Sequence, residues 1–91
     1  MDSLHVEVTG LVQGVGFRWF VVGKARELNL SGWVKNRGDG MVEVLAAGDP
    51  ASLELLEAAI VAGPPGAQVQ HVQKLPPLPT DGLKTPFGIS R

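Results

Sequence analysis

Arg18 and Asn36 are the two side chains of this chain whose setting suggests chemistry. Arg18 ends a loop whose glycines, Gly14 and Gly16, allow a tight turn and let several backbone N–H groups converge on one anion. A helix that starts at this loop adds the positive end of its dipole, and the Arg18 guanidinium adds a charged fork that matches a phosphate. Together with Asn36, and without a nucleophile nearby, these residue types indicate phosphate chemistry driven by water.

The apolar pattern before and after the loop predicts the elements that hold it. Residues 4–9 alternate between apolar and polar types, as in a half-buried strand. Over residues 17–28 the apolar side chains recur at a spacing of three and four, which predicts an amphipathic helix. Residues 29–32 then contain the Asn, Ser and Gly that stop a helix. The loop therefore lies between a strand and the N-terminus of a helix.

Asn36 ends the next predicted strand, residues 32–36. The Arg-Gly-Asp-Gly sequence at 37–40 predicts a hairpin turn, and residues 41–47 return as a third strand. Asn is also common where a turn begins, so a purely structural role for Asn36 is the alternative to a catalytic one.

A second helix is predicted to begin at Pro50, since Asp49 is a good N-cap and proline suits the first helical position. The Gly-Pro-Pro-Gly sequence at 63–66 ends this helix.

The patterns become weaker toward the C-terminus. Residues 67–75 predict a fourth strand in which Val69 and Val72 are out of phase for a period of two, so we expect a bulge or a twist there. After a proline-containing loop, residues 87–89 predict a short last strand. It belongs at an edge of the sheet, because the preceding Pro86 fits only an edge position.

The order of elements predicts the fold class. Two right-handed β-α-β crossovers place both helices on one face of an antiparallel sheet, so we expect an α+β, ferredoxin-like βαββαβ sandwich with a short extra C-terminal edge strand. A chain of 91 residues has room for one core, and we interpret residues 1–91 as a single domain. If one strand separates the first strand from the second, the glycine loop and Asn36 lie within reach of each other.

The composition argues against several kinds of partner. Eight Lys and Arg are balanced by nine Asp and Glu, so the chain lacks the basic excess of a nucleic-acid-binding protein. There is no cysteine, and the two histidines, His5 and His71, are expected at the surface, which leaves little for a metal site. The sequence has no apolar run of the roughly 18 residues that a membrane helix needs, and no signal-peptide pattern. We expect a cytoplasmic protein that binds no metal, nucleic acid or membrane, and nothing demands more than a monomer.

Two motifs carry a resemblance to a known family: Val12-Gln13-Gly14-Val15-Gly16-Phe17-Arg18 and, farther along, Gly32-Trp33-Val34-Lys35-Asn36. With further matches at 38–40, 42–44 and 63–69, the chain closely resembles the acylphosphatase family over residues 4–75. The proline-containing loop at 76–79 has no clear counterpart in that family, and the chain ends in Ser90-Arg91 where family members often continue to an aromatic residue.

The resemblance implies a small stand-alone enzyme that hydrolyses acyl phosphates to a carboxylate and phosphate without a cofactor. It implies that Arg18 is the catalytic arginine and that Asn36 is the catalytic asparagine. The phosphate-binding loop that it implies consists of Gln13, Gly14, Val15, Gly16, Phe17 and Arg18.

These residue types suit that reaction. The leaving carboxylate has a pKa of about 4 to 5, by comparison with side-chain carboxyl groups, so no general acid has to protonate it. The enzyme must stabilise charge on the phosphoryl oxygens and align a water. The loop N–H groups and Arg18 can hold the oxygens, while the Asn36 amide accepts a hydrogen bond from the water and orients it.

Each of these residues also has a simpler interpretation. The glycines could form only a tight turn, and Arg18 could be solvated, although a cation is unfavourable at a helix N-terminus. We interpret Trp19 and Trp33 as packing residues or partial cover near the site, with substrate contact as the alternative. Lys35 and Arg37 could steer an anionic substrate, but solvated charges are the simpler interpretation.

Three other functions compete with hydrolysis. The first is a non-catalytic ferredoxin-like module that binds an anion or has a regulatory role, but such a module would be expected to have lost Arg18 or Asn36. The second is an RNA-binding module, which needs exposed aromatic residues that the strand at 41–47 lacks. The third is a domain of a larger maturation enzyme, although no zinc-type cysteine motif follows here.

Overall fold

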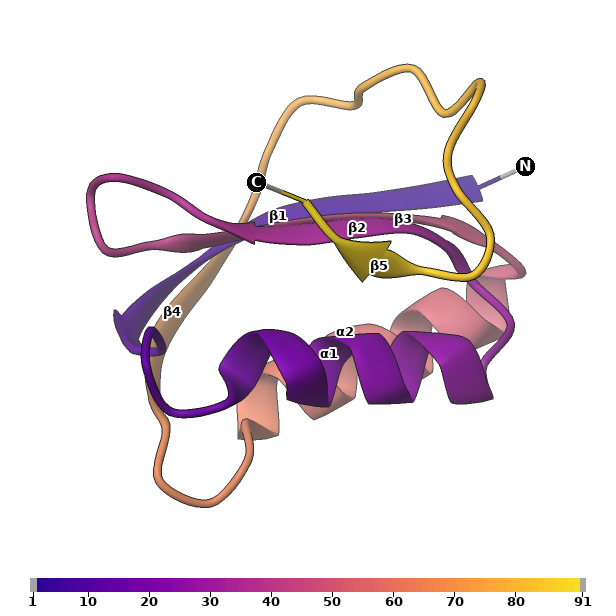
Figure 1. Cartoon of the computed structure of the whole chain (residues 1–91). Helices are drawn as coiled ribbons and strands as arrows, with labels where there is room; N and C mark the ends of the chain where they lie inside the picture. The colour runs from indigo at the N-terminus through magenta and orange to yellow at the C-terminus, as the bar shows by residue number, and fades with distance from the viewer. Residues whose placement is uncertain (1, 91) are drawn as a thin grey trace.

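The structure is a computed structural model that describes residues 2–90, so Arg91 of the predicted C-terminus lies outside it. The elements in chain order are β1 (Asp2–Leu11), α1 (Phe17–Glu27), β2 (Ser31–Asn36), β3 (Val42–Gly48), α2 (Pro50–Ala62), β4 (Gln68–Lys74) and β5 (Gly88–Ile89). The strands form one sheet with both helices against one face, and the segment between β4 and β5 crosses the other face (Figure 1). The predicted fold class, a ferredoxin-like βαββαβ sandwich, is confirmed.

The order of the strands brings the two candidate motifs to one end of the sheet. The order is β4-β1-β3-β2-β5, so β3 separates β1 from β2 and is antiparallel to both. Strands β1 and β2 therefore run in the same direction. The loop after β1 and Asn36, the last residue of β2, lie at the same end of the sheet, as the fold prediction required.

The last strand makes the sheet mixed, whereas the sequence predicted an antiparallel one. β5 pairs in parallel with β2, with Trp33 opposite Gly88 and Val34 opposite Ile89. The chain leaves β4 at the end of the sheet where β2 begins, and it crosses the helix-free face to reach the far edge (Figure 1). A strand that starts from that end must run in the direction of β2.

The bulge predicted near Val69 and Val72 is present in β4. Opposite β1, His71 pairs with Thr9 but the next pair joins Val69 to Gly10, so Gln70 is the extra residue. The extra residue restores the phase of the strand, and both valines pack against the core. Gly10 (φ +127°) is required here, because a Cβ atom on it would lie 2.0 Å from the carbonyl oxygen of Gln68.

The ends of the helices follow the signals in the sequence. Asn29 adopts a left-handed conformation (φ 56°), and the Leu30 N–H donates to the carbonyl of Ala25 at 3.0 Å, which terminates α1. Asp49 caps α2, as predicted, because its carboxylate accepts hydrogen bonds from the N–H groups of Ala51 and Ser52.

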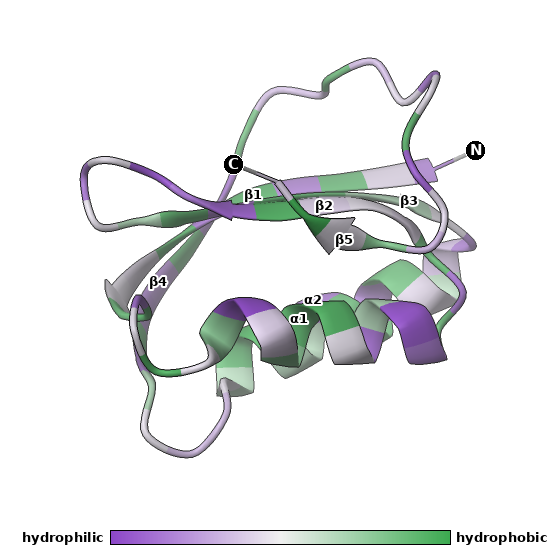
Figure 2. Ribbon diagram, in the orientation of Figure 1, coloured by the Kyte–Doolittle hydropathy of each residue, from purple (hydrophilic) through white to green (hydrophobic). Residues whose placement is uncertain are grey.

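The core lies between the sheet and the helices and contains buried residues of both layers. Both layers carry hydrophobic residues along their length (Figure 2). Phe17, the first residue of α1, is 1% exposed, so its burial fixes the start of this helix against the sheet. The fully buried core residues around it include Val6, Val8, Val34, Val44, Leu56, Ile60 and Phe87.

Candidate active site

The glycine loop forms a small cradle at the start of α1. Gly14 (φ +76°) and Gly16 (φ +78°) both have the left-handed conformation that favours glycine. Successive backbone N–H groups in such turns point into a common concavity that suits an anion. The cradle is a cavity of about 80 Å³ lined by Val12, Gly14, Gly16, Phe17, Arg18 and Trp19.

The N-terminus of α1 opens into this cradle without a side-chain cap. Gly16 occupies the N-cap position and has no side chain to accept a hydrogen bond, and the first turn contains no acidic residue. The first N–H groups of a helix have no partner within the helix itself. The positive end of the helix dipole and these donors can therefore serve a bound anion.

Arg18 lies on the first turn of α1, is half-buried and lines the cradle. Within residues 2–90 no carboxylate forms an ion pair with it, in contrast to Arg37, which pairs with Glu7 and Asp39. Its guanidinium can donate two parallel hydrogen bonds to an oxyanion. Arg18 therefore lies where the loop meets the helix, and its catalytic role stays a prediction.

Asn36 presents a buried acceptor without a partner. It shares the helix-facing side of β2 with Val34, because alternate residues of a strand point to the same face. Its Oδ1 atom is buried, yet no donor in the described part of the chain reaches it. Since an unsatisfied buried polar atom costs free energy, such an atom needs an explanation, and a bound water or substrate supplies one.

Gln13, one of the predicted loop residues, makes side-chain contacts that the sequence did not predict. Only its backbone N–H was expected to take part, but its side-chain amide donates to the carbonyl oxygens of Arg37 and Met41, both at 2.9 Å. These carbonyls flank the β2–β3 turn, directly after Asn36. Gln13 therefore ties the cradle to the end of the strand that carries Asn36.

The β2–β3 turn is itself held by charges. The Arg37 guanidinium donates to Glu7 at 2.5 Å and pairs with Asp39 at 3.0 Å, and the pKa of Arg37 is raised chiefly by the hydrogen bond to Glu7. Lys35 pairs with Glu43 at 3.9 Å. Lys35 and Arg37, which the sequence suggested as solvated charges, therefore form ion pairs that brace the sheet.

His5 was expected at the surface, but this prediction is wrong. Its side chain is 7% exposed, its Nε2 lies 2.6 Å from a Glu43 carboxylate oxygen, and its Nδ1 lies 2.7 Å from the Pro76 carbonyl oxygen. The segment between β4 and β5 covers this ring, and the sequence gives no pattern that predicts such a long-range contact. His71 is exposed, as expected.

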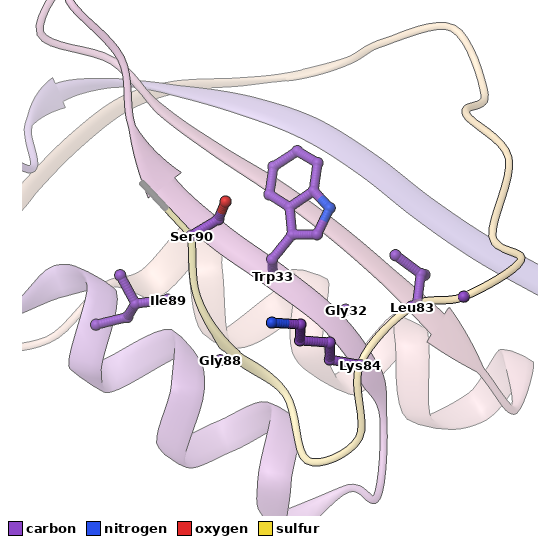
Figure 3. Close-up of a pocket in the computed structure, with 8 residues that line it drawn as sticks. Gly32, Trp33, Leu83, Lys84, Gly88, Ile89 and Ser90 are labelled. Carbon is purple, nitrogen blue, oxygen red and sulfur yellow. The ribbon is translucent and has the colours of Figure 1, made fainter.

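The two tryptophans have different surroundings. Trp19 is 67% exposed, so it is not a packing residue, and it lines the cradle. Trp33 is half-buried and faces away from Asn36, on the helix-free side of β2. It lines a separate hollow of about 250 Å³ between β2, β5 and the segment that leads to β5, with Lys84 beside it (Figure 3). That hollow contains neither Arg18 nor Asn36.

Two further features bear on the predicted partners. No helix among residues 2–90 has the length and apolar character to cross a membrane. The same residues contain no group of three His, Asp or Glu side chains arranged to hold a metal ion.

Comparisons with known proteins give consistent matches. A family model described as acylphosphatase matches residues 4–89, so the match continues through the proline-containing segment and β5. An acylphosphatase from Koribacter versatilis is 49% identical over 78 residues, which are 86% of this chain and 71% of that protein. An acylphosphatase from Bifidobacterium longum is 48% identical over a stretch that covers 75% of this chain and 70% of that protein.

Solved structures show the same relationship. The crystal structure of an acylphosphatase from Bacillus subtilis superposes with a TM-score of 0.92 at 38% identity, and all of both chains is covered. Full-length HypF, in a phosphate- and nucleotide-bound form, is similar with a TM-score of 0.83 at 28% identity, over 98% of this chain but 12% of HypF.

Proposed function

Because this chain belongs to the acylphosphatase family and hydrolyses acyl phosphates to a carboxylate and inorganic phosphate, we propose that the cradle and Asn36 divide that reaction between them. The loop that borders the cradle, residues 13–18, binds the phosphoryl group. Asn36 positions the water that attacks it. The observation that carries the proposal is the buried, unpartnered Oδ1 of Asn36 at the same end of the sheet as an uncapped helix N-terminus.

In this proposal the phosphoryl oxygens are bound by three kinds of group. The backbone N–H groups from Gln13 to Arg18 donate to them, the dipole of α1 stabilises their charge, and the Arg18 guanidinium holds two of them. The absence of an ion pair on Arg18 within residues 2–90 supports this role, because no internal carboxylate competes with the substrate.

Asn36 acts on the water. Its Oδ1 accepts a hydrogen bond from the water and aims the lone pair of the water oxygen at phosphorus, in line with the bond that breaks. As the new P–O bond forms, the bond between phosphorus and the acyl oxygen breaks, and its electrons leave on the carboxylate. One proton of the water stays on the new P–OH group, and the other passes to a phosphate oxygen or to solvent.

In this proposal the activation barrier is lowered by positioning and by charge stabilisation. The phosphoryl transition state carries its charge on oxygens that the cradle already faces, and a carboxylate leaves without protonation. Donors that are fixed before the reaction need no reorganisation as charge develops. We propose that no metal or cofactor takes part, a statement that hydrolysis in the presence of a chelator tests directly.

The assembly proposed here is one chain acting as a single-domain monomer. The cradle, Arg18 and Asn36 all come from the same copy, which supports a site that is complete in one chain. Size-exclusion chromatography with light scattering would test the monomer. A cytoplasmic location stays a prediction, and cell fractionation would test it.

The decisive experiment measures benzoyl phosphate hydrolysis with chelator present for the wild type, Arg18→Gln and Asn36→Ala. We expect Arg18→Gln to lose about 10²–10³-fold in kcat/KM, as for a lost oxyanion donor. Asn36→Ala should lose about 10²-fold in kcat, as for a misplaced reacting group, with little change in inhibition by phosphate.

Matched controls separate these roles from folding. Lys24→Gln removes a cation from the last turn of the same helix, and Gln73→Ala removes an exposed amide from β4. Both should keep wild-type kcat. A folded Asn36→Ala protein with normal kcat would remove Asn36 from the mechanism. Turnover that stops with chelator would contradict metal independence.

The non-catalytic module considered from the sequence gains no support. The relatives named above are acylphosphatases, and both Arg18 and Asn36 are present.

A further inference from the structure

Trp19 stands out because it is large, apolar and exposed beside the catalytic machinery. At 67% exposure it is the most exposed large hydrophobic side chain among residues 2–90. It also lines the same cavity as Arg18 and the two loop glycines. An exposed indole is not needed by the core, which Phe17 and Val21 of the same helix already fill.

The size of the cradle leaves the acyl group outside it. At about 80 Å³ the cavity suits a phosphoryl group, whereas pockets that enclose whole organic ligands measure about 300–1,000 Å³. An acyl group attached to a bound phosphate must therefore lie on the rim. Of the residues that line the cavity, Trp19 has the large, solvent-exposed apolar surface.

Helix geometry directs this side chain toward the rim. Side chains in an α-helix lean toward the N-terminus, so Trp19 on the first turn of α1 covers the turn that borders the cradle. Phe17, Val21 and Val22 form the buried face of α1, and Trp19 lies away from that face and from the sheet. In the proposed mechanism the water held by Asn36 attacks from the side of the sheet, so an in-line leaving group departs away from the sheet, on the side where Trp19 lies.

We propose that Trp19 is an acyl-binding residue and that it selects acyl phosphates with aromatic or extended apolar acyl groups over small ones. This inference rests on the proposed function, since it needs the phosphate to be bound in the cradle. An aromatic ring can stack on the indole or meet it edge to face. The methyl group of acetyl phosphate is too small to cover an indole, so it gains little from this contact.

The test compares benzoyl phosphate with acetyl phosphate for the wild type, Trp19→Ala, Trp19→Phe and Leu55→Ala. Trp19→Ala should lower kcat/KM for benzoyl phosphate about fivefold, mainly through KM, and leave acetyl phosphate and inhibition by inorganic phosphate unchanged. Trp19→Phe should keep most of the preference. Leu55→Ala removes an exposed apolar side chain (60% exposed) from the other helix, α2, and should change kcat/KM for neither substrate.

The outcomes separate this inference from the proposed function. An unchanged ratio of benzoyl to acetyl phosphate in Trp19→Ala would overturn the acyl-binding role, whether both rates stay the same or fall together. The roles of Arg18 and Asn36 are judged by their own variants, which should lose activity toward acetyl phosphate as well as benzoyl phosphate, because Trp19 contributes little to the former. Circular dichroism spectra that match the wild type would show that Trp19→Ala is folded, as expected for alanine at an exposed helical position.

Discussion

The N-termini of α1 and α2 lie in the same layer but are completed in different ways. Asp49 closes α2, accepting hydrogen bonds from the Ala51 N–H at 3.1 Å and the Ser52 N–H at 3.4 Å. α1 begins at Gly16, which has a left-handed backbone and no capping side chain. Relative to a capping side chain, glycine at an N-cap costs only a few tenths of a kcal/mol, so α1 leaves its first N–H groups free of a side chain at a small cost in stability.

This difference distinguishes the N-terminus of α2, which is closed by its own side chain, from the N-terminus of α1, which is open to an anion. A side chain that satisfied the first N–H groups of α1 would occupy the place proposed for the phosphate. The first turn of α1 instead carries Arg18, a cation where the helix dipole disfavours one. Both features lower stability in the free protein, and both favour an anion in the cradle.

The comparison predicts that phosphate should act as the missing cap of α1. At a concentration 100 times its Kd, inorganic phosphate should raise the free energy of unfolding by about 2.7 kcal/mol. Thermal unfolding at constant ionic strength, with chloride as the control anion, measures this. The rise should disappear in Arg18→Gln. An equal rise in that variant would mean that the anion acts elsewhere.

Removing the brace of the cradle should have a smaller effect, mainly on catalysis. Gln13→Leu loses both hydrogen bonds to the β2–β3 turn, so the cradle can shift relative to Asn36. We expect kcat/KM to fall about tenfold, which is less than the 10²-fold that a full 1 Å displacement of a reacting group can cost. Steady-state kinetics with Gln73→Ala as the control amide would check this. A variant with wild-type kcat/KM would show that the loop holds its position alone.

The smallest effect is expected at the capped helix. Asp49→Ala should lower the free energy of unfolding by about 1 kcal/mol, which corresponds to a fall in Tm of about 4–8 °C in a domain of this size. Catalysis should not change, because Asp49 is not part of the cradle. Calorimetry and a single kinetic assay suffice. A loss of activity greater than the loss of folded protein would show that the two helix ends are coupled.

The sequence predicted those features that depend on neighbours in the chain. The α2 cap at Asp49-Pro50, the end of α1 near Asn29 and the bulge near Val69 all follow from local residue types, and all are confirmed. The glycine loop was likewise recognisable, because Gly14 and Gly16 adopt conformations that few other residues tolerate.

Features that depend on distant partners were not predictable in this way. The Gln13 side chain donates to carbonyls 24 and 28 residues away. Since every residue has a backbone carbonyl, the residue types do not reveal such partners. His5 is buried by a segment more than 70 residues away, which has no regular pattern of its own. The parallel pairing of β5 depends on the path of that same segment across the sheet.

The two-residue strand β5 also has a consequence for how the protein behaves at high concentration. Without it, β2 would be an open edge, and its unpaired backbone groups could recruit a strand from another molecule, which is a common start of aggregation. β5 and its neighbours occupy that edge: the Gly32 N–H donates to the Lys84 carbonyl, and the Ser90 N–H donates to the Val34 carbonyl. The short strand itself offers little length for further pairing. The C-terminal segment thus covers the edge of β2 at which another molecule could otherwise pair.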